Sequence, residues 1–162
     1  MFQKILKKIK NGTLTSVAVA GFVIGTPSDD ILSDAGKFRD FIYAESGNDV
    51  LVYTPSINQD STDVYDGGVG MDTLWLRLSE REYERADVRS DLIGFFYHIL
   101  NNADVSSPSK EGAQFHFQAF GLQVSNIENV MIEQVNSRDI TVNSTLTQEF
   151  MKLKDTSKDS LT

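Results

Sequence analysis

The feature that most constrains the fold is a series of aspartates between residues 25 and 76, each placed directly before a short, mostly apolar stretch. Successive aspartates are 10, 9, 14 and 9 residues apart. A short unit of polar turn and three-residue strand, repeated at a near-constant spacing, is typical of a solenoid in which strands of successive units stack in parallel. The repeated aspartates are Asp30, Asp40, Asp49, Asp63 and Asp72.

The clearest unit runs from Gly67 to Trp75 and matches the nonapeptide G-G-x-G-x-D-x-U-x, in which U is a large aliphatic residue. Its glycines, Gly67, Gly68 and Gly70, permit turns with positive φ and leave carbonyl oxygens uncovered. Asp72 adds a charged oxygen to the same turn. Calcium takes six to eight hard oxygen ligands, so such a turn is suited to bind Ca²⁺.

Two units make one turn of a solenoid, so turns two units apart should stack on the same side. This arrangement predicts three calcium sites at most, between Asp30 and Asp49, between Asp40 and Asp63, and between Asp49 and Asp72. The Asp49/Asp72 site should bind best, because both of its turns keep a glycine at the fourth position. The candidate ligands that accompany these two aspartates are Gly47, Asn48, Gly67, Gly68 and Gly70.

The other turns are degenerate. Ser28 and Phe38 stand at the fourth position of two of them, and the turn before Asp63 holds no glycine. The spacing of 14 before Asp63 indicates an insertion of five residues around 54–58. We therefore expect the Asp40/Asp63 site to be vestigial.

The remaining chain predicts a strand over residues 17–24, a helix over 79–103 and strands near 115–120, 122–124 and 127–132. Ser79 and Glu82 form a capping-box pattern at the start of the helix. The expected buried stripe of this helix is Leu92, Phe96, Ile99, Leu100 and Ala103. The aromatic residues expected in the core are Trp75, Phe95, Phe96, Phe115 and Phe117.

Three segments follow from these patterns. Residues 1–16 are a basic amphipathic segment, either a helix or the start of a signal peptide ending at Ala20. Residues 11–16 are too polar for the apolar central region that a signal peptide has. Residues 17–136 form the repeat domain with its helix and capping strands. Residues 137–162 are a Ser/Thr-rich tail, which we expect to be disordered from about Lys152.

Composition excludes several functional classes. The net charge is −8, which argues against nucleic-acid binding. There is no cysteine, so disulfides and thiolate metal sites are absent. No apolar run approaches the roughly 20 residues of a membrane-spanning helix. His98 and His116 do not form an H-E-x-x-H zinc motif, and the sequence has no nucleophile elbow or phosphate loop. We therefore expect that the protein is not an enzyme.

The repeats resemble the RTX (hemolysin-type calcium-binding) family. The unit at Gly67–Trp75, the charged helix and the segment Phe115–Val130 are together similar to terminal regions of large secreted RTX adhesins and cadherin-like RTX proteins, over residues 20–135. The resemblance implies a mainly β fold: a short parallel β-roll (a right-handed solenoid) of RTX nonapeptides, one helix and capping strands. It also implies export to the extracellular space through type I secretion machinery, with residues 137–162 as a candidate uncleaved signal. The chain departs from the family by its shortness, since it has no recognisable toxin, protease or adhesive domain.

Two hypotheses of different classes follow. In the first, the chain is a calcium-binding module of a secreted adhesin- or toxin-like protein that folds on meeting calcium after export. In the second, it is a structural domain for adhesion or assembly, with a protein or cell-surface target, in which calcium is incidental. Partner binding that survives chelation of calcium would favour the second.

Overall fold

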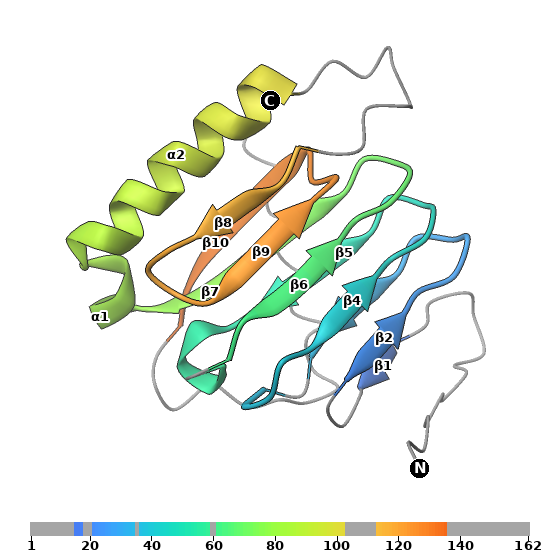
Figure 1. Cartoon of the computed structure of the whole chain (residues 1–162), viewed down its shortest axis with the longest axis horizontal. Helices are drawn as coiled ribbons and strands as arrows, with labels where there is room; N and C mark the ends of the chain where they lie inside the picture. The colour runs from blue at the N-terminus through green and yellow to red at the C-terminus, as the bar shows by residue number, and fades with distance from the viewer. Residues whose placement is uncertain (1–14, 18–20, 35, 59–60, 103–112, 136–162) are drawn as a thin grey trace, which may run out of the picture.

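A computed structural model describes residues 15–17, 21–34, 36–58, 61–102 and 113–135 of the chain. This part of the protein is mainly β, with two sheets of parallel strands and two α-helices (Figure 1). The predicted basic segment at 1–16 and the tail at 137–162 lie almost entirely outside the described residues. No helix within the described ranges is long and apolar enough to cross a membrane.

The strands alternate between the two sheets along the repeat region, so that β1, β3, β5 and β7 enter one sheet and β2, β4 and β6 enter the other. The first sheet is parallel throughout and has the order β1 (Thr15–Val17), β3 (Ile31–Ser33), β5 (Val50–Tyr53), β7 (Thr73–Ser79) and β10 (Asn129–Val135). The second has the order β2 (Phe22–Ile24), β4 (Phe41–Tyr43), β6 (Asp63–Asp66), β9 (Leu122–Ser125) and β8 (Phe115–Phe117). Only β8, among these strands, runs antiparallel to its neighbour.

The strand register follows the spacing of the aspartates. Ile31 pairs with Val50 and Val50 with Thr73, while Phe41 pairs with Val64 in the other sheet. The offset between paired residues is 19 for the first of these pairs and 23 for the other two. The additional residues lie where the insertion was predicted, because the 3₁₀ helix η1 (Pro55–Ile57) follows β5.

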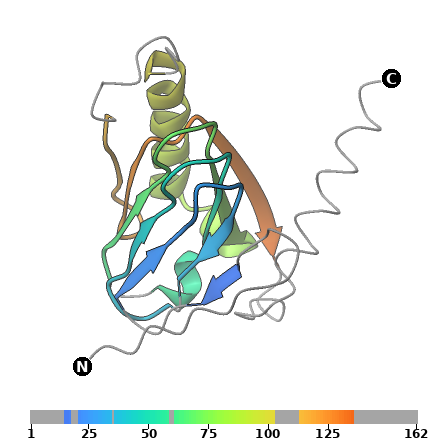
Figure 2. The same cartoon turned by 90° about the vertical axis from the view of Figure 1, so that its right-hand side faces the viewer.

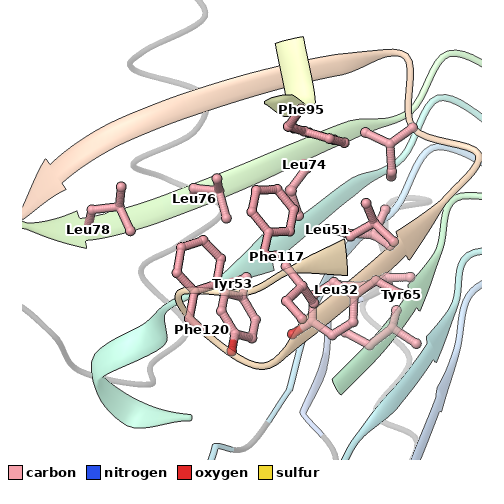
Figure 3. Close-up of a cluster of buried hydrophobic side chains, with 14 of the residues drawn as sticks. Leu32, Leu51, Tyr53, Tyr65, Leu74, Leu76, Leu78, Phe95, Phe117 and Phe120 are labelled. Carbon is pink, nitrogen blue, oxygen red and sulfur yellow. The ribbon is translucent and has the colours of Figure 1, made fainter. Parts of the chain in front are cut away.

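The two sheets face each other (Figure 2), and the core lies between them. Leu32, Leu51 and Leu74 occupy equivalent places on three neighbouring strands and are fully buried, as the aliphatic position of the repeat predicts. Tyr53, Phe117 and Phe120 extend the core toward the helical end, where Phe95 joins it (Figure 3). Trp75 is buried in a separate cluster with Ile31, Val50 and Val52, because successive side chains of a strand face opposite sides of the sheet.

The predicted helix is present as two helices, α1 (Glu80–Tyr83) and α2 (Ala86–Asn102). The capping box is confirmed: the Ser79 hydroxyl accepts the Glu82 N–H at 3.3 Å, and the Ser79 N–H donates to Glu82 Oε2 at 2.7 Å. These two bonds satisfy groups at the helix start that would otherwise lack partners.

Part of the predicted buried stripe of this helix is wrong. Phe96 is 47% exposed and Leu100 74% exposed. The buried face instead carries Phe95. The centroid of its ring lies 5.1 Å from the ring centroid of Phe115 and 4.9 Å from that of Phe117, both in β8. Packing against β8 therefore selects Phe95 over the adjacent Phe96. The members of the buried face are Val88, Leu92 and Phe95, with Ile99 packed against them, and the predicted Ala103 lies outside the described residues.

The single strand predicted at residues 17–24 is also wrong. Val17 ends β1 in one sheet and Phe22 begins β2 in the other. Val17 and Phe22 therefore belong to different sheets, and Gly21, with φ of +133°, lies just before β2.

Candidate metal centre

The five repeated aspartates stand in two rows of stacked turns, one on each side of the molecule. The first row, called here the glycine row, consists of turns 25–30, 44–49 and 67–72, which lead into β3, β5 and β7. The opposite row consists of the turns ending at Asp40 and Asp63, which lead into β4 and β6. Each aspartate immediately precedes its strand, so the strand register places each one beside its counterpart in the row.

Direct hydrogen bonds connect the aspartates of the glycine row. The Asp30 N–H donates to Asp49 Oδ1 at 2.7 Å, and the Asp49 N–H donates to Asp72 Oδ1 at 2.8 Å. The series continues outside the repeats, because the Asp72 N–H donates to Glu128 Oε2 at 2.8 Å. The structure thus brings Asp30 beside Asp49 and Asp49 beside Asp72, the two pairs that the spacing predicted for this side.

The opposite row shows the same bond at its predicted pair. The Asp40 N–H donates to Asp63 Oδ1 at 2.9 Å, and the Gly21 N–H donates to Asp40 Oδ1 at 2.8 Å. The row ends differently, because the Asp63 N–H donates to the carbonyl oxygen of Gly121 and not to a carboxylate.

The second carboxylate oxygens distinguish the aspartates from one another. Oδ2 of Asp40, Asp49 and Asp72 is buried and has no hydrogen-bond partner within the described part of the chain. Oδ2 of Asp30, by contrast, accepts the N–H and the hydroxyl of Thr26 at 2.6 and 2.9 Å. A buried polar atom without a partner is costly, and a bound cation is one way to offset that cost. These three oxygens are therefore candidate metal ligands.

Burial makes the carboxylates difficult to ionise in the absence of a cation. It raises the pKa of Asp49 to about 6 and the pKa values of Asp63 and Asp72 to about 7. Neighbouring negative charges add to the effect, with Asp49 and Glu128 both raising the pKa of Asp72. A divalent cation between these groups would favour their charged forms.

Glycines allow the turns of the glycine row to approach each other closely. Gly70 has φ of +147°, and a Cβ there would fall well inside van der Waals contact with the carbonyl oxygen of Gly47. A Cβ on Gly68, with φ of +87°, would collide in the same way with the carbonyl oxygen of Glu45. Carbonyl oxygens of one turn therefore point at the next turn, as a site between turns would require.

Asn48 also connects neighbouring turns of the glycine row. Its N–H donates to Asp29 Oδ1 at 2.8 Å, and its side-chain Oδ1 accepts the Met71 N–H at 3.0 Å. In this geometry the side-chain oxygen of Asn48 is a hydrogen-bond acceptor for a backbone N–H. Asn48 therefore contributes to the stacking of three successive turns.

Sequence reasoning missed Asp34, a buried carboxylate close to the opposite row. Asp34 accepts the Gly36 N–H at 3.1 Å, the Asn58 side-chain amide at 2.9 Å and the Tyr65 hydroxyl. Burial raises its pKa. Asp34 does not stand before an apolar strand, so the repeat pattern gives no signal for it.

Glu128 was also missed, although the sequence does hold a signal for it. It stands directly before β10, in the position that Asp72 occupies before β7, since Asn129 pairs with Thr73. A carboxylate before an apolar strand is the pattern of the repeats, carried here by glutamate and not aspartate.

No group of three or more His, Cys, Asp or Glu side chains arranged to hold a metal ion occurs in the described ranges. A cation between two stacked turns would therefore draw many of its ligands from backbone carbonyls.

Comparison with known protein families, with curated proteins and with solved structures finds no match to this chain.

Replacing Gly70 by alanine should destabilise the protein by about 2 kcal/mol or more, because the new Cβ meets the Gly47 carbonyl and φ is unfavourable for alanine. The measurement is denaturant unfolding followed by circular dichroism. Met71→Ala, at an exposed position of the same turn, is the matched control and should change stability little. Equal stability of the two variants would contradict the close approach of the turns.

The metal-free protein should be less stable at pH 8 than at pH 5. The folded-state pKa values of Asp49, Asp63 and Asp72 are raised above the usual 3.8, so the folded form retains protons that the unfolded chain has released. Their contribution to stability is full below about pH 4 and is lost as the pH rises toward 7. Denaturant unfolding of protein stripped on a chelating resin measures this, and a double Asp49→Asn/Asp72→Asn variant should weaken the dependence. Stability that increases from pH 5 to pH 8 would contradict it.

Proposed function

We propose that this chain is a calcium-binding module of the RTX type whose sheets form a short parallel β-roll, a right-handed solenoid, that becomes ordered when calcium binds. The observation that carries the proposal is the pair Asp49 and Asp72. The two carboxylates are fully buried on neighbouring turns. Asp49 Oδ1 accepts the Asp30 N–H and Asp72 Oδ1 accepts the Asp49 N–H, while Oδ2 of each is unpartnered in the described structure.

The chemistry of these turns favours calcium among common cations. The candidate ligands are oxygens, from the two carboxylates and from carbonyls such as that of Gly47, and turns 44–49 and 67–72 hold no cysteine or histidine. Ca²⁺ accepts many oxygens in flexible geometry, whereas Mg²⁺ is smaller, demands a near-ideal octahedron and gives up its water reluctantly. A site built from two irregular turns is therefore better suited to Ca²⁺.

Calcium binding would be coupled to folding. Without a cation, the folded form holds carboxylates close together in a buried setting, which opposes their ionisation at neutral pH. An ion that binds only the folded form adds RT ln(1 + [L]/Kd), about 2.7 kcal/mol at a hundredfold excess over Kd. The proposed order of events is export of an open chain through a type I channel where calcium is scarce, followed by folding outside the cell as part of a secreted adhesin- or toxin-like protein.

The sites should differ in strength. The Asp49/Asp72 turns carry the glycines that let carbonyl oxygens approach. In the opposite row, the turn before Asp63 holds no glycine, and Asp63 Oδ2 already accepts the Ser61 hydroxyl at 3.4 Å. We therefore rank the Asp49/Asp72 site above the Asp40/Asp63 site.

Millimolar calcium should raise the melting temperature of the full chain by about 5–10 °C, the shift expected from a few kcal/mol of ligand binding in a protein of this size. It should also increase the β-sheet signal in circular dichroism. Magnesium at the same concentration is the control and should do neither. A melting temperature that ignores calcium would favour a structural or interaction domain in which the ion is incidental.

Asp72→Ala should weaken calcium binding at least about tenfold, because it removes a charged ligand from the glycine row. Asp40→Ala, which removes an equally buried aspartate from the opposite row, should change the strongest binding step little. Isothermal titration calorimetry compares the two variants directly. Equal losses of affinity would contradict the ranking of the sites.

A further inference from the structure

We propose that a further calcium site lies between the last glycine-row turn, 67–72, and the segment Ser125–Glu128, with Asp72, Glu128 and the carbonyl oxygen of Asn126 as its ligands. The proposal rests on the calcium-binding function proposed above. It adds a site whose second turn lies outside the repeats and lacks their glycines.

Two oxygens converge over Gly67. A Cβ placed on Gly67 would lie 2.7 Å from Asp72 Oδ2 and in steric collision with the carbonyl oxygen of Asn126. Both oxygens therefore meet beside the Cα of Gly67, from two different segments. Asp72 is fully buried, and its Oδ2 is one of the oxygens without a hydrogen-bond partner among the described residues. This unpartnered oxygen, which also faces the proposed Asp49/Asp72 site, is available to a ligand at Gly67.

Further negative groups surround this point. Glu128 Oε2 lies 2.8 Å from the Asp72 nitrogen, the same arrangement that joins Asp49 to Asp72. Asp66 Oδ1 accepts the Asn126 side-chain amide at 2.7 Å and the Gly68 N–H at 3.1 Å. A cation here would offset the repulsion between the carboxylates of Asp72 and Glu128.

The backbone holds the two segments together at both ends. Asp66 pairs with Ser125 in one sheet, and Thr73 pairs with Asn129 in the other. Between these pairs, the Gly67 N–H donates to the Ser125 carbonyl at 3.1 Å. Asn126 adopts φ of +52°, unusual for a residue other than glycine. The segment thus follows the last repeat turn closely without sharing its sequence.

An ion at this position would connect parts of the chain that are far apart in sequence. Asp72 and Glu128 are 56 residues apart, and α1, α2 and β8 lie between them. Calcium would therefore fasten the returning strands β9 and β10 to the last repeat. Asp72 would serve two ions, one shared with Asp49 and one shared with Glu128.

Glu128→Gln is the variant that tests this site, because the amide oxygen can still accept the Asp72 N–H while the charge is lost. The matched control is Glu84→Gln, an exposed glutamate in the same protein. Native mass spectrometry and isothermal titration calorimetry of the full chain with calcium chloride give the number of ions and their affinities. Glu128→Gln should bind one ion fewer, or one ion about tenfold or more weakly, and Glu84→Gln should match the wild type.

The outcomes separate the two proposals. A wild-type chain that binds no calcium overturns both of them. A wild-type chain that binds calcium, together with a folded Glu128→Gln variant that binds the same number of ions with the same affinities, overturns this site alone. If Glu128→Gln does not fold, the ¹³C side-chain carboxyl resonance of Glu128 in the wild type decides. A shift that saturates with calcium supports the site, and no shift while calcium binds elsewhere overturns it.

Discussion

The interaction on which this structure depends is the hydrogen bond from the backbone N–H of one aspartate to the carboxylate of the aspartate in the next turn. It joins neighbouring turns of each row, and it occurs at Asp30/Asp49, Asp49/Asp72 and Asp40/Asp63. The bond uses one oxygen and draws the second into the protein. The contact that aligns the strands is thus the same contact that gathers buried negative charge, and stacking and the need for a counter-charge cannot be separated.

The two rows of turns differ in how their buried carboxylates are compensated. In the glycine row, carbonyl oxygens face the neighbouring turn, and Oδ2 of Asp49 and of Asp72 has no partner in the described residues. In the opposite row, Asp40 Oδ2 also has no partner among the described residues, but Asp63 Oδ2 accepts the Ser61 hydroxyl at 3.4 Å. Beside this row, Asp34 receives three donors from the protein. A carboxylate that already accepts several hydrogen bonds has less to gain from a cation. Any dependence on calcium should therefore be concentrated in the glycine row.

The sequence was sufficient for those features that depend on local spacing. The 9–10-residue interval placed the strands, the pairing of the aspartates and the buried Leu32, Leu51 and Leu74, because a period determines which residues become neighbours. The sequence did not determine how segments far apart in the chain pack against each other. Phe95 and Phe96 are adjacent aromatics, and only the position of β8 determines which of them is buried. The role of Asp34 depends on Tyr65 and Asn58, which are 31 and 24 residues away.

The region after the repeats is better understood as an interrupted continuation of the stack than as a cap. β9 and β10 extend both sheets in parallel, each by one strand beyond β6 and β7. The segment from α1 to β8 is inserted between β7 and β9, and the chain then returns to the pattern of strand, short turn, carboxylate and strand. Since Glu128 accepts the Asp72 N–H as Asp72 accepts that of Asp49, the rule that builds the repeats still operates where their sequence has ended. In this sheet the carboxylate before the strand is therefore kept where the glycines are not, whereas in the other sheet Gly121 stands before β9 and its carbonyl oxygen accepts the Asp63 N–H instead.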